Sequence, residues 1–156
     1  MRNVLLKLFI GLAITSIGMF GDDNSIGTWK RNIEKSKATP PNPNPITSLT
    51  IVHEAVDGGA KVTVTGGRKD GTPINASYTV KYDGKEYPVE GAPWDTISVK
   101  QIDANTFTTE TKKTGGKWHV TGRTVISKDG KIMTATTKGT NAEGQPYTSK
   151  LVYEKQ

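Results

Sequence analysis

The sequence predicts an all-β protein, built as a single antiparallel up-and-down barrel of eight to ten strands with little or no helix after the N-terminal region. Three observations predict this fold. Apolar and polar residues alternate along most of the chain after Ile46, as strands with one buried face require. Turn-forming pairs that contain Gly recur along most of the chain after residue 57, and no amphipathic helix of about ten residues or more is found among them.

Residues 1–21 are predicted to be a secretory signal peptide. Arg2 and Lys7 flank or enter an apolar run from Val4 to Phe20. Ser16 and Gly18 offer one cleavage point and Gly21 a second, of which removal by Gly21 is favoured. The run is short for a spanning helix of about 20 residues, with an uncleaved anchor as the alternative. We therefore expect residues 22–156 to form one barrel domain, located in the periplasm or secreted, with no membrane insertion after cleavage.

Composition excludes several classes of protein. The chain has no Cys, which removes a lipoprotein anchor, a disulfide framework, a thiol nucleophile and Cys-based metal sites. The formal charge of +6 falls to +4 without Arg2 and Lys7. Acidic residues are interspersed with the lysines and no basic-aromatic RNA motif occurs, so no nucleic-acid partner is expected.

The elements follow in order along the chain. A first short strand opens at Gly27-Thr28-Trp29-Lys30, and four prolines within residues 38–45 predict a stiff extended connection instead of a helix. Alternation then marks strands that contain Leu49 and Ile51, Val62 and Val64, and Tyr78, Val80 and Tyr82. Later strands are expected within residues 97–102, 106–112, 117–127, 132–138 and 147–154.

Six turn signals separate these strands: Asp57-Gly58-Gly59, Asp70-Gly71, Asp83-Gly84, Gly115-Gly116, Asp129-Gly130 and Glu143-Gly144. They favour tight hairpins, and closing the resulting meander into a barrel removes its exposed edges. Residues 66–73 and 139–146 carry Gly and Pro at the same offsets. This is either convergent turn chemistry or a duplicated unit, and both interpretations predict hairpins at 70–73 and 143–146.

The two ends of the chain carry a family resemblance. Gly27-Thr28-Trp29 resembles the Gly-x-Trp opening of lipocalins and fatty-acid-binding proteins, and residues 151–155 resemble the last strand of the latter. The chain is thus similar to bacterial-type lipocalin-like, calycin-type barrels. The resemblance implies that Gly27 and Trp29 close one end of the barrel, that Arg123 packs on the Trp29 ring, and that Tyr153 lines a pocket.

The chain also departs from these families. Fatty-acid-binding proteins have a helical lid where this chain has the proline-rich connection, and they place an Arg two residues before the last-strand Tyr, where this chain has Leu151. The resemblance therefore does not imply a fatty-acid site, and a charged anchor is expected to be missing.

Threonine is frequent in the predicted strands, so the interior should mix hydroxyl groups with aromatic rings, which suits a small amphipathic molecule. Trp94 is expected at a barrel mouth. The candidate ligand-binding residues are Tyr78, Tyr82, Trp118, Arg123 and Tyr153.

The sequence predicts neither catalysis nor a metal or cofactor site. His53 and His119 are the only histidines, and no nucleophile motif accompanies them. Two functions stay open. A monomeric exported barrel that binds a small amphipathic molecule predicts an interior cavity entered opposite Trp29. The alternative is an interaction or inhibitor protein of the envelope or the extracellular space. This function predicts a filled core and loops near Trp94 or the prolines that contact a partner.

Overall fold

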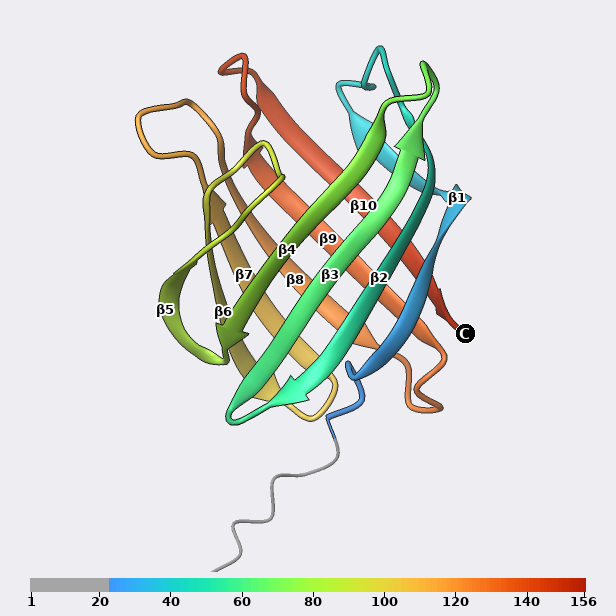
Figure 1. The fold of residues 1–156 in the computed structure, drawn as a ribbon, viewed down its shortest axis with the longest axis vertical. Helices are drawn as coiled ribbons and strands as arrows, with labels where there is room; N and C mark the ends of the chain where they lie inside the picture. Colours follow the sequence, from blue (N-terminus) through green and yellow to red (C-terminus); the bar gives the residue numbers. More distant parts are fainter. Residues whose placement is uncertain (1–22) are drawn as a thin grey trace, which may run out of the picture.

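The computed structural model describes residues 23–156, which form ten antiparallel strands around a nearly closed barrel (Figure 1). This part of the chain contains no helix, so it has none that could cross a membrane. The predicted signal peptide, residues 1–21, lies outside the described residues. The predicted fold class is confirmed. The strands are β1 (Gly27–Thr39), β2 (Ile46–Val56), β3 (Gly59–Arg68), β4 (Pro73–Lys81), β5 (Asp83–Pro88), β6 (Thr96–Asp103), β7 (Thr106–Lys112), β8 (His119–Ile126), β9 (Ile132–Thr140) and β10 (Pro146–Lys155).

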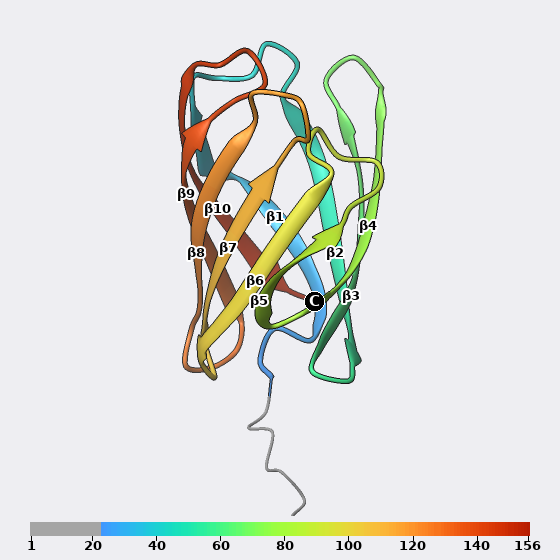
Figure 2. The same ribbon diagram turned by 90° about the vertical axis from the view of Figure 1, so that its left-hand side faces the viewer.

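The first strand pairs with the last, and the sheet has its two edges at consecutive strands, β4 and β5. The strand order is β4-β3-β2-β1-β10-β9-β8-β7-β6-β5, so β1 pairs with β10 and the edges are β4 and β5 (Figure 2). A single bridge links β4 to the segment after β5: the amides of Ser77 and Glu90 each donate to the other's carbonyl oxygen at 3.0 Å. One pair of hydrogen bonds thus closes the sheet at this point.

Both hairpins predicted from the repeated segments are present. In the loop between β3 and β4, Arg68 N donates to Thr72 O and Gly71 N to Arg68 O; in the loop between β9 and β10, Asn141 N donates to Gln145 O and Gly144 N to Asn141 O. These are the same hydrogen bonds at the same offset. The six predicted turns also carry a glycine with positive φ, at Gly58, Gly71, Gly84, Gly115, Gly130 and Gly144.

Two predictions about elements are wrong. The first strand is not short: β1 has 13 residues, with its register against β10 broken between Asn32 and Lys37. The strand expected to include Tyr82 ends at Lys81, and a further strand, β5, begins at Asp83, while Gly84 has the positive φ expected of the turn. The sequence hides β5 because only Tyr87 within it is partly buried, so no apolar alternation marks it.

Trp29 seals the end of the barrel from which the N-terminal segment emerges. Its side chain is 0% exposed, and its Nε1 donates to Ser25 O at 2.7 Å. The cation over the ring is Lys155, with Nζ 5.2 Å from the ring centroid, and not the expected Arg123, which is exposed on β8. Lys155 can take this place because it faces Trp29 across the β1–β10 ladder.

Candidate ligand-binding interior

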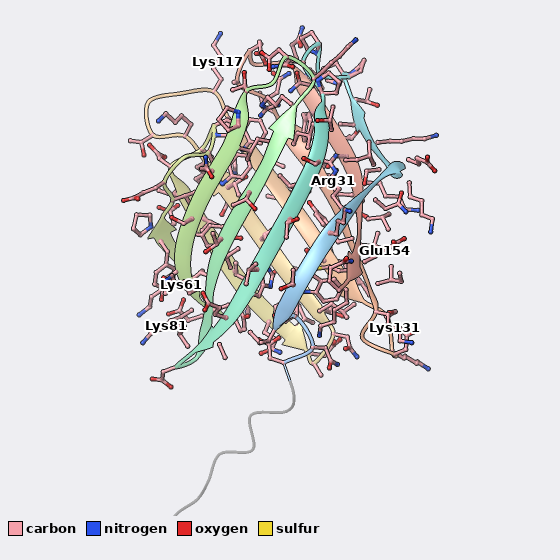
Figure 3. The ribbon with its side chains drawn as sticks, turned by 45° about the vertical axis from the view of Figure 1, so that its right-hand side comes forward. Arg31, Lys61, Lys81, Lys117, Lys131 and Glu154 are labelled. Atoms are coloured by element: carbon pink, nitrogen blue, oxygen red, sulfur yellow. The ribbon has the colours of Figure 1, made fainter. Side chains whose placement is uncertain are left out.

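The inner surface of the barrel has one apolar wall and one hydroxyl-bearing wall. Alternation with core residues places aliphatic side chains inward on β2, β3 and β4, namely Leu49, Ile51, Val62, Val64, Ala76 and Val80. On β7 to β10 the same rule places hydroxyl groups inward, at Thr109, Thr111, Thr124, Thr137 and Ser149. They alternate with apolar side chains that also face inward, among them Phe107, Val120, Ile126 and Met133. By contrast, Lys61, Lys81 and Lys131 extend outward from the barrel (Figure 3).

Gly122 fixes the spacing on the hydroxyl wall. A Cβ at this position would lie 2.8 Å from Thr109 Oγ1 and 3.1 Å from Thr137 Cγ2, closer than packed atoms allow. The glycine therefore lets these two threonines from neighbouring strands approach each other over β8. Thr137 Oγ1 in turn lies 2.7 Å from Ser149 Oγ, so part of this wall is already hydrogen-bonded within the protein.

Three aromatic side chains gather at the end of the barrel opposite Trp29, where β6, β8 and β10 begin. Trp94 stacks on Trp118 with centroids 5.1 Å apart, and Trp118 lies 5.6 Å from Tyr147 in a tilted pair. Trp118 Nε1 donates to Thr111 Oγ1 at 2.9 Å, whereas Trp94 Nε1 is buried with no hydrogen-bond partner in residues 23–156. We call this group the aromatic rim.

The predicted site residues fall in different places. Tyr78 and Tyr153 face the interior, and burial raises the pKa of both phenols, which keeps them neutral. Trp118 belongs to the aromatic rim instead of the core. Tyr82 lies at the sealed end, where its hydroxyl donates to Asp23 Oδ2 at 2.8 Å and its ring meets Phe107 edge-on.

Arg123 lies outside the interior altogether. On β8 the inward positions are Val120, Gly122, Thr124 and Ile126, and Arg123 is exposed on the opposite face. The strand period alone forbids the expected role, because neighbouring side chains point to opposite faces of a sheet.

Two inward polar residues were missed by sequence reasoning, Arg31 and His53. Arg31 follows Trp29 by two positions, so it shares the inner face of β1, and its Nε is buried without a partner in the described residues. His53 pairs with Gly27 near the sealed end, and burial lowers its pKa despite the opposing effect of the Asp23 carboxylate. Counting by twos from Trp29 would have found Arg31.

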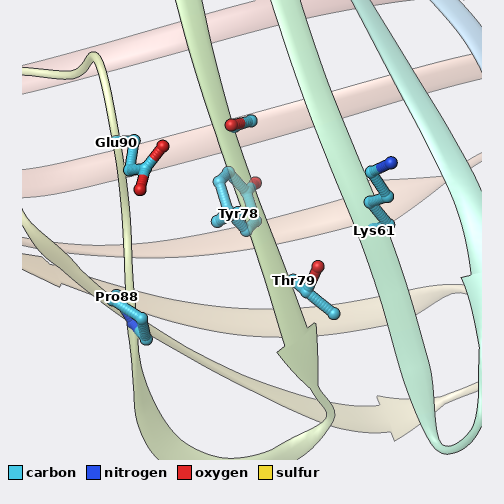
Figure 4. Close-up of a pocket in the computed structure, with 6 residues that line it drawn as sticks. Lys61, Tyr78, Thr79, Pro88 and Glu90 are labelled. Atoms are coloured by element: carbon cyan, nitrogen blue, oxygen red, sulfur yellow. The ribbon is translucent and has the colours of Figure 1, made fainter.

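Two shallow depressions lie outside the barrel, along the closure between β4 and β5. One, of about 270 Å³, is lined by Lys61, Ser77, Tyr78, Thr79, Pro88 and Glu90 (Figure 4). The other, of about 360 Å³, adjoins it over β3, β4 and Gly91. They share Ser77 and Glu90, the two residues that make the closing bridge, so they form one continuous groove on this face.

No group of three or more His, Asp or Glu side chains in residues 23–156 is arranged to hold a metal ion. Fold and site together define the class of protein: a ten-stranded up-and-down β-barrel with one end sealed by Trp29 and a two-sided interior below an aromatic rim.

Comparison with known proteins gives structural likeness only. No family model and no curated protein sequence matches the chain. Among solved structures, a protein described as EF1p2_mFAP2b bound to DFHBI has a TM-score of 0.49 at 9% identity, covering 85% of this chain and 94% of that one. A redesigned β-barrel, mFAP1, bound to DFHBI has a TM-score of 0.40 at 14% identity, covering 84% and 98%. Membership of the lipocalin or fatty-acid-binding families stays a prediction.

Proposed function

We propose that this protein is an exported, non-catalytic barrel that binds a small amphipathic molecule in its interior. The observation that carries the proposal is the division of the inner surface into an aliphatic wall on β2 to β4 and a hydroxyl wall on β7 to β10. A ligand with an apolar body and polar groups along one side matches both walls, whereas pure hydrocarbon would leave the hydroxyl wall without partners.

The aromatic rim supports the same proposal. Stacked indoles at the end opposite Trp29 offer flat apolar surface beside a buried N–H donor, that of Trp94 Nε1, which has no partner in residues 23–156. A ligand entering at this end would pass the rim and could accept that hydrogen bond. The other end is blocked by the Trp29 side chain and its bond to Ser25.

A second candidate function is an interaction or inhibitor protein of the envelope or the extracellular space. It is favoured by the groove along the β4–β5 closure, because both depressions described above lie on the outer surface. In this case the interior is filled and the groove contacts another protein.

Native mass spectrometry of the protein purified from its own host tests the proposal, with the same sample unfolded and refolded as the ligand-free reference. A retained species of a few hundred daltons that disappears after refolding supports the small-molecule barrel. The mass of the protein without a bound small molecule, together with a stoichiometric co-purifying polypeptide, contradicts the small-molecule barrel and supports the interaction protein. The mass of the isolated chain also locates the N-terminus, which tests removal of residues 1–21.

A further inference from the structure

Arg31 places a permanent positive charge on the inner face of the barrel wall. Arg31 lies on β1 directly opposite Tyr153 of β10 in the strand ladder, and two positions along from the fully buried Trp29. Tyr153 is only 5% exposed and belongs to the core. The Arg31 side chain therefore enters the interior beside the Tyr153 ring.

This charge has no counterion in the described part of the chain. The Arg31 side chain makes no hydrogen bond and no ion pair within residues 23–156, and its Nε is fully buried. The nearby carboxylate of Glu154 accepts from Asn32 Nδ2 at 2.9 Å on the other face of the sheet. The Asp23 carboxylate is held at the sealed end by Ser25 and Tyr82.

An arginine side chain carries a permanent positive charge. The Arg31 side chain is half-buried and its Nε is fully buried, and the favourable arrangement for such a group is an anion that meets its N–H groups directly. Since the described residues supply no such anion, we infer that the ligand carries it.

Two phenols face the interior, and one of them, Tyr153, lies beside the guanidinium. Tyr153 is its ladder partner, and Tyr78 faces the interior from β4; neither hydroxyl has a hydrogen-bond partner within residues 23–156. Because burial raises the pKa of both phenols, they remain hydrogen-bond donors at neutral pH. An oxyanion has several acceptor sites, so it can accept from a guanidinium and a phenol at once.

We propose that Arg31, with Tyr153 beside it, binds the anionic head group of the ligand, so that the ligand is a small organic acid whose apolar body lies on the aliphatic wall. This inference rests on the proposed function, since it names the class of molecule that the barrel interior takes. A carboxylate or sulfonate fits the site because one negative charge balances the single guanidinium.

A pair of fluorescent probes that differ only in charge tests the inference. The anionic probe is 8-anilinonaphthalene-1-sulfonate, and the neutral one is N-phenyl-1-naphthylamine, the same ring system without the sulfonate. We expect the wild-type protein to bind both, the anion more tightly. Arg31→Gln should weaken binding of the anion by about tenfold to one-hundredfold, as for loss of charge-assisted hydrogen bonds, and should leave the neutral probe within about threefold.

Arg123→Gln is the matched control, because it removes the same charge from the exposed face of β8. It should leave both affinities unchanged. If both probes bind but Arg31→Gln leaves the anion affinity unchanged, or weakens both probes equally, the anion site is wrong and the binding barrel stands. If neither probe binds the wild type, the proposed function itself fails.

Stability measurements keep the test valid if Arg31→Gln affects folding. Arg31→Met removes a charge that has no partner in residues 23–156 while keeping an unbranched chain, so the ligand-free variant should unfold at the same temperature as wild type or higher. A clear fall in the unfolding temperature would show that the guanidinium supports the fold and would overturn the inference. Tyr153→Phe should weaken binding of the anion by about three- to tenfold with the fold intact; an unchanged affinity removes Tyr153 from the site.

Discussion

Replacing Trp29 with Ala tests whether the sealed end holds the barrel together. The side chain is 0% exposed, lies in the main core cluster, and is bonded through Nε1 to Ser25 O at 2.7 Å. Lys155 covers the ring from the solvent side. Every contact of the indole would be lost together in this variant.

The size of the effect follows from these contacts. An indole buries about 200 Å², and at about 25 cal/mol per Å² its transfer contributes about 5 kcal/mol, part of which the remaining Ala keeps. The buried hydrogen bond adds about 1 kcal/mol. Partial collapse around the cavity offsets some of the loss, so we expect the free energy of unfolding to fall by about 3 to 5 kcal/mol. That is a large share of the roughly 5 to 15 kcal/mol that stabilises an ordinary domain.

Urea denaturation, followed by far-ultraviolet circular dichroism, measures this quantity. Trp29→Phe should cost less, about 1 to 3 kcal/mol, because it keeps most of the ring and loses the bond to Ser25. Trp94→Ala, at the half-buried aromatic rim, is the control of equal volume change and should also cost less than Trp29→Ala. A Trp29→Ala protein that loses under about 1.5 kcal/mol at an unchanged m-value, or that loses only ligand binding, would refute the reasoning.

Two further predictions concern His53 and the closure of the barrel. Burial lowers the pKa of His53, so the unfolded chain takes up the proton first and stability should fall as pH drops from about 6.5 towards the folded pKa, by at most about 1.4 kcal/mol per pH unit. Urea midpoints of His53→Gln should depend less on pH than those of the wild type over this range; identical profiles for wild type and His53→Gln would contradict this. At Gly91, with φ +76°, a Cβ would lie 1.9 Å from Asn75 O, so Gly91→Ala should open the closing bridge and speed amide exchange of Ser77 and Glu90. Gly71→Ala has a similar φ of +86° with open space around it and should leave those two amides protected; faster exchange in both variants would assign the effect to backbone strain alone.

The fold could be predicted because strand and turn signals are local. A strand with one buried face needs apolar residues at every second position, and a tight hairpin needs a residue that tolerates positive φ, which glycine supplies at each of the six predicted turns. The missed element, β5, is an edge strand with one partly buried side chain, so burial left no pattern in it. Nor does any local signal tell that a single bridge, between Ser77 and Glu90, closes the barrel.

The candidate site could be predicted only in part, because the strand period gives the face of a residue but not its height in the barrel. Tyr78 and Tyr82 look equivalent in the sequence, yet Tyr78 lies within β4 and Tyr82 is bonded to Asp23 at the sealed end. The error at Arg123 could be seen in the sequence, because with Val120 taken as inward, position 123 falls on the outer face. The role given to Arg123 followed from the family resemblance, which the two-residue period of the strand contradicts.

The interior charge shows why spacing along the chain is a poor guide to a barrel site. Leu151 on β10 led to the expectation that no charged anchor is present, since that expectation considered one strand only. Side chains from two strands become neighbours through the ladder register, and here the register sets Arg31 of the first strand beside Tyr153 of the last. A functional group at a given level of the inner wall can thus come from either of two paired strands. For a closed meander, the residues to compare are therefore those at one level around the wall, and the strands that meet at the ends of the chain must be included among them.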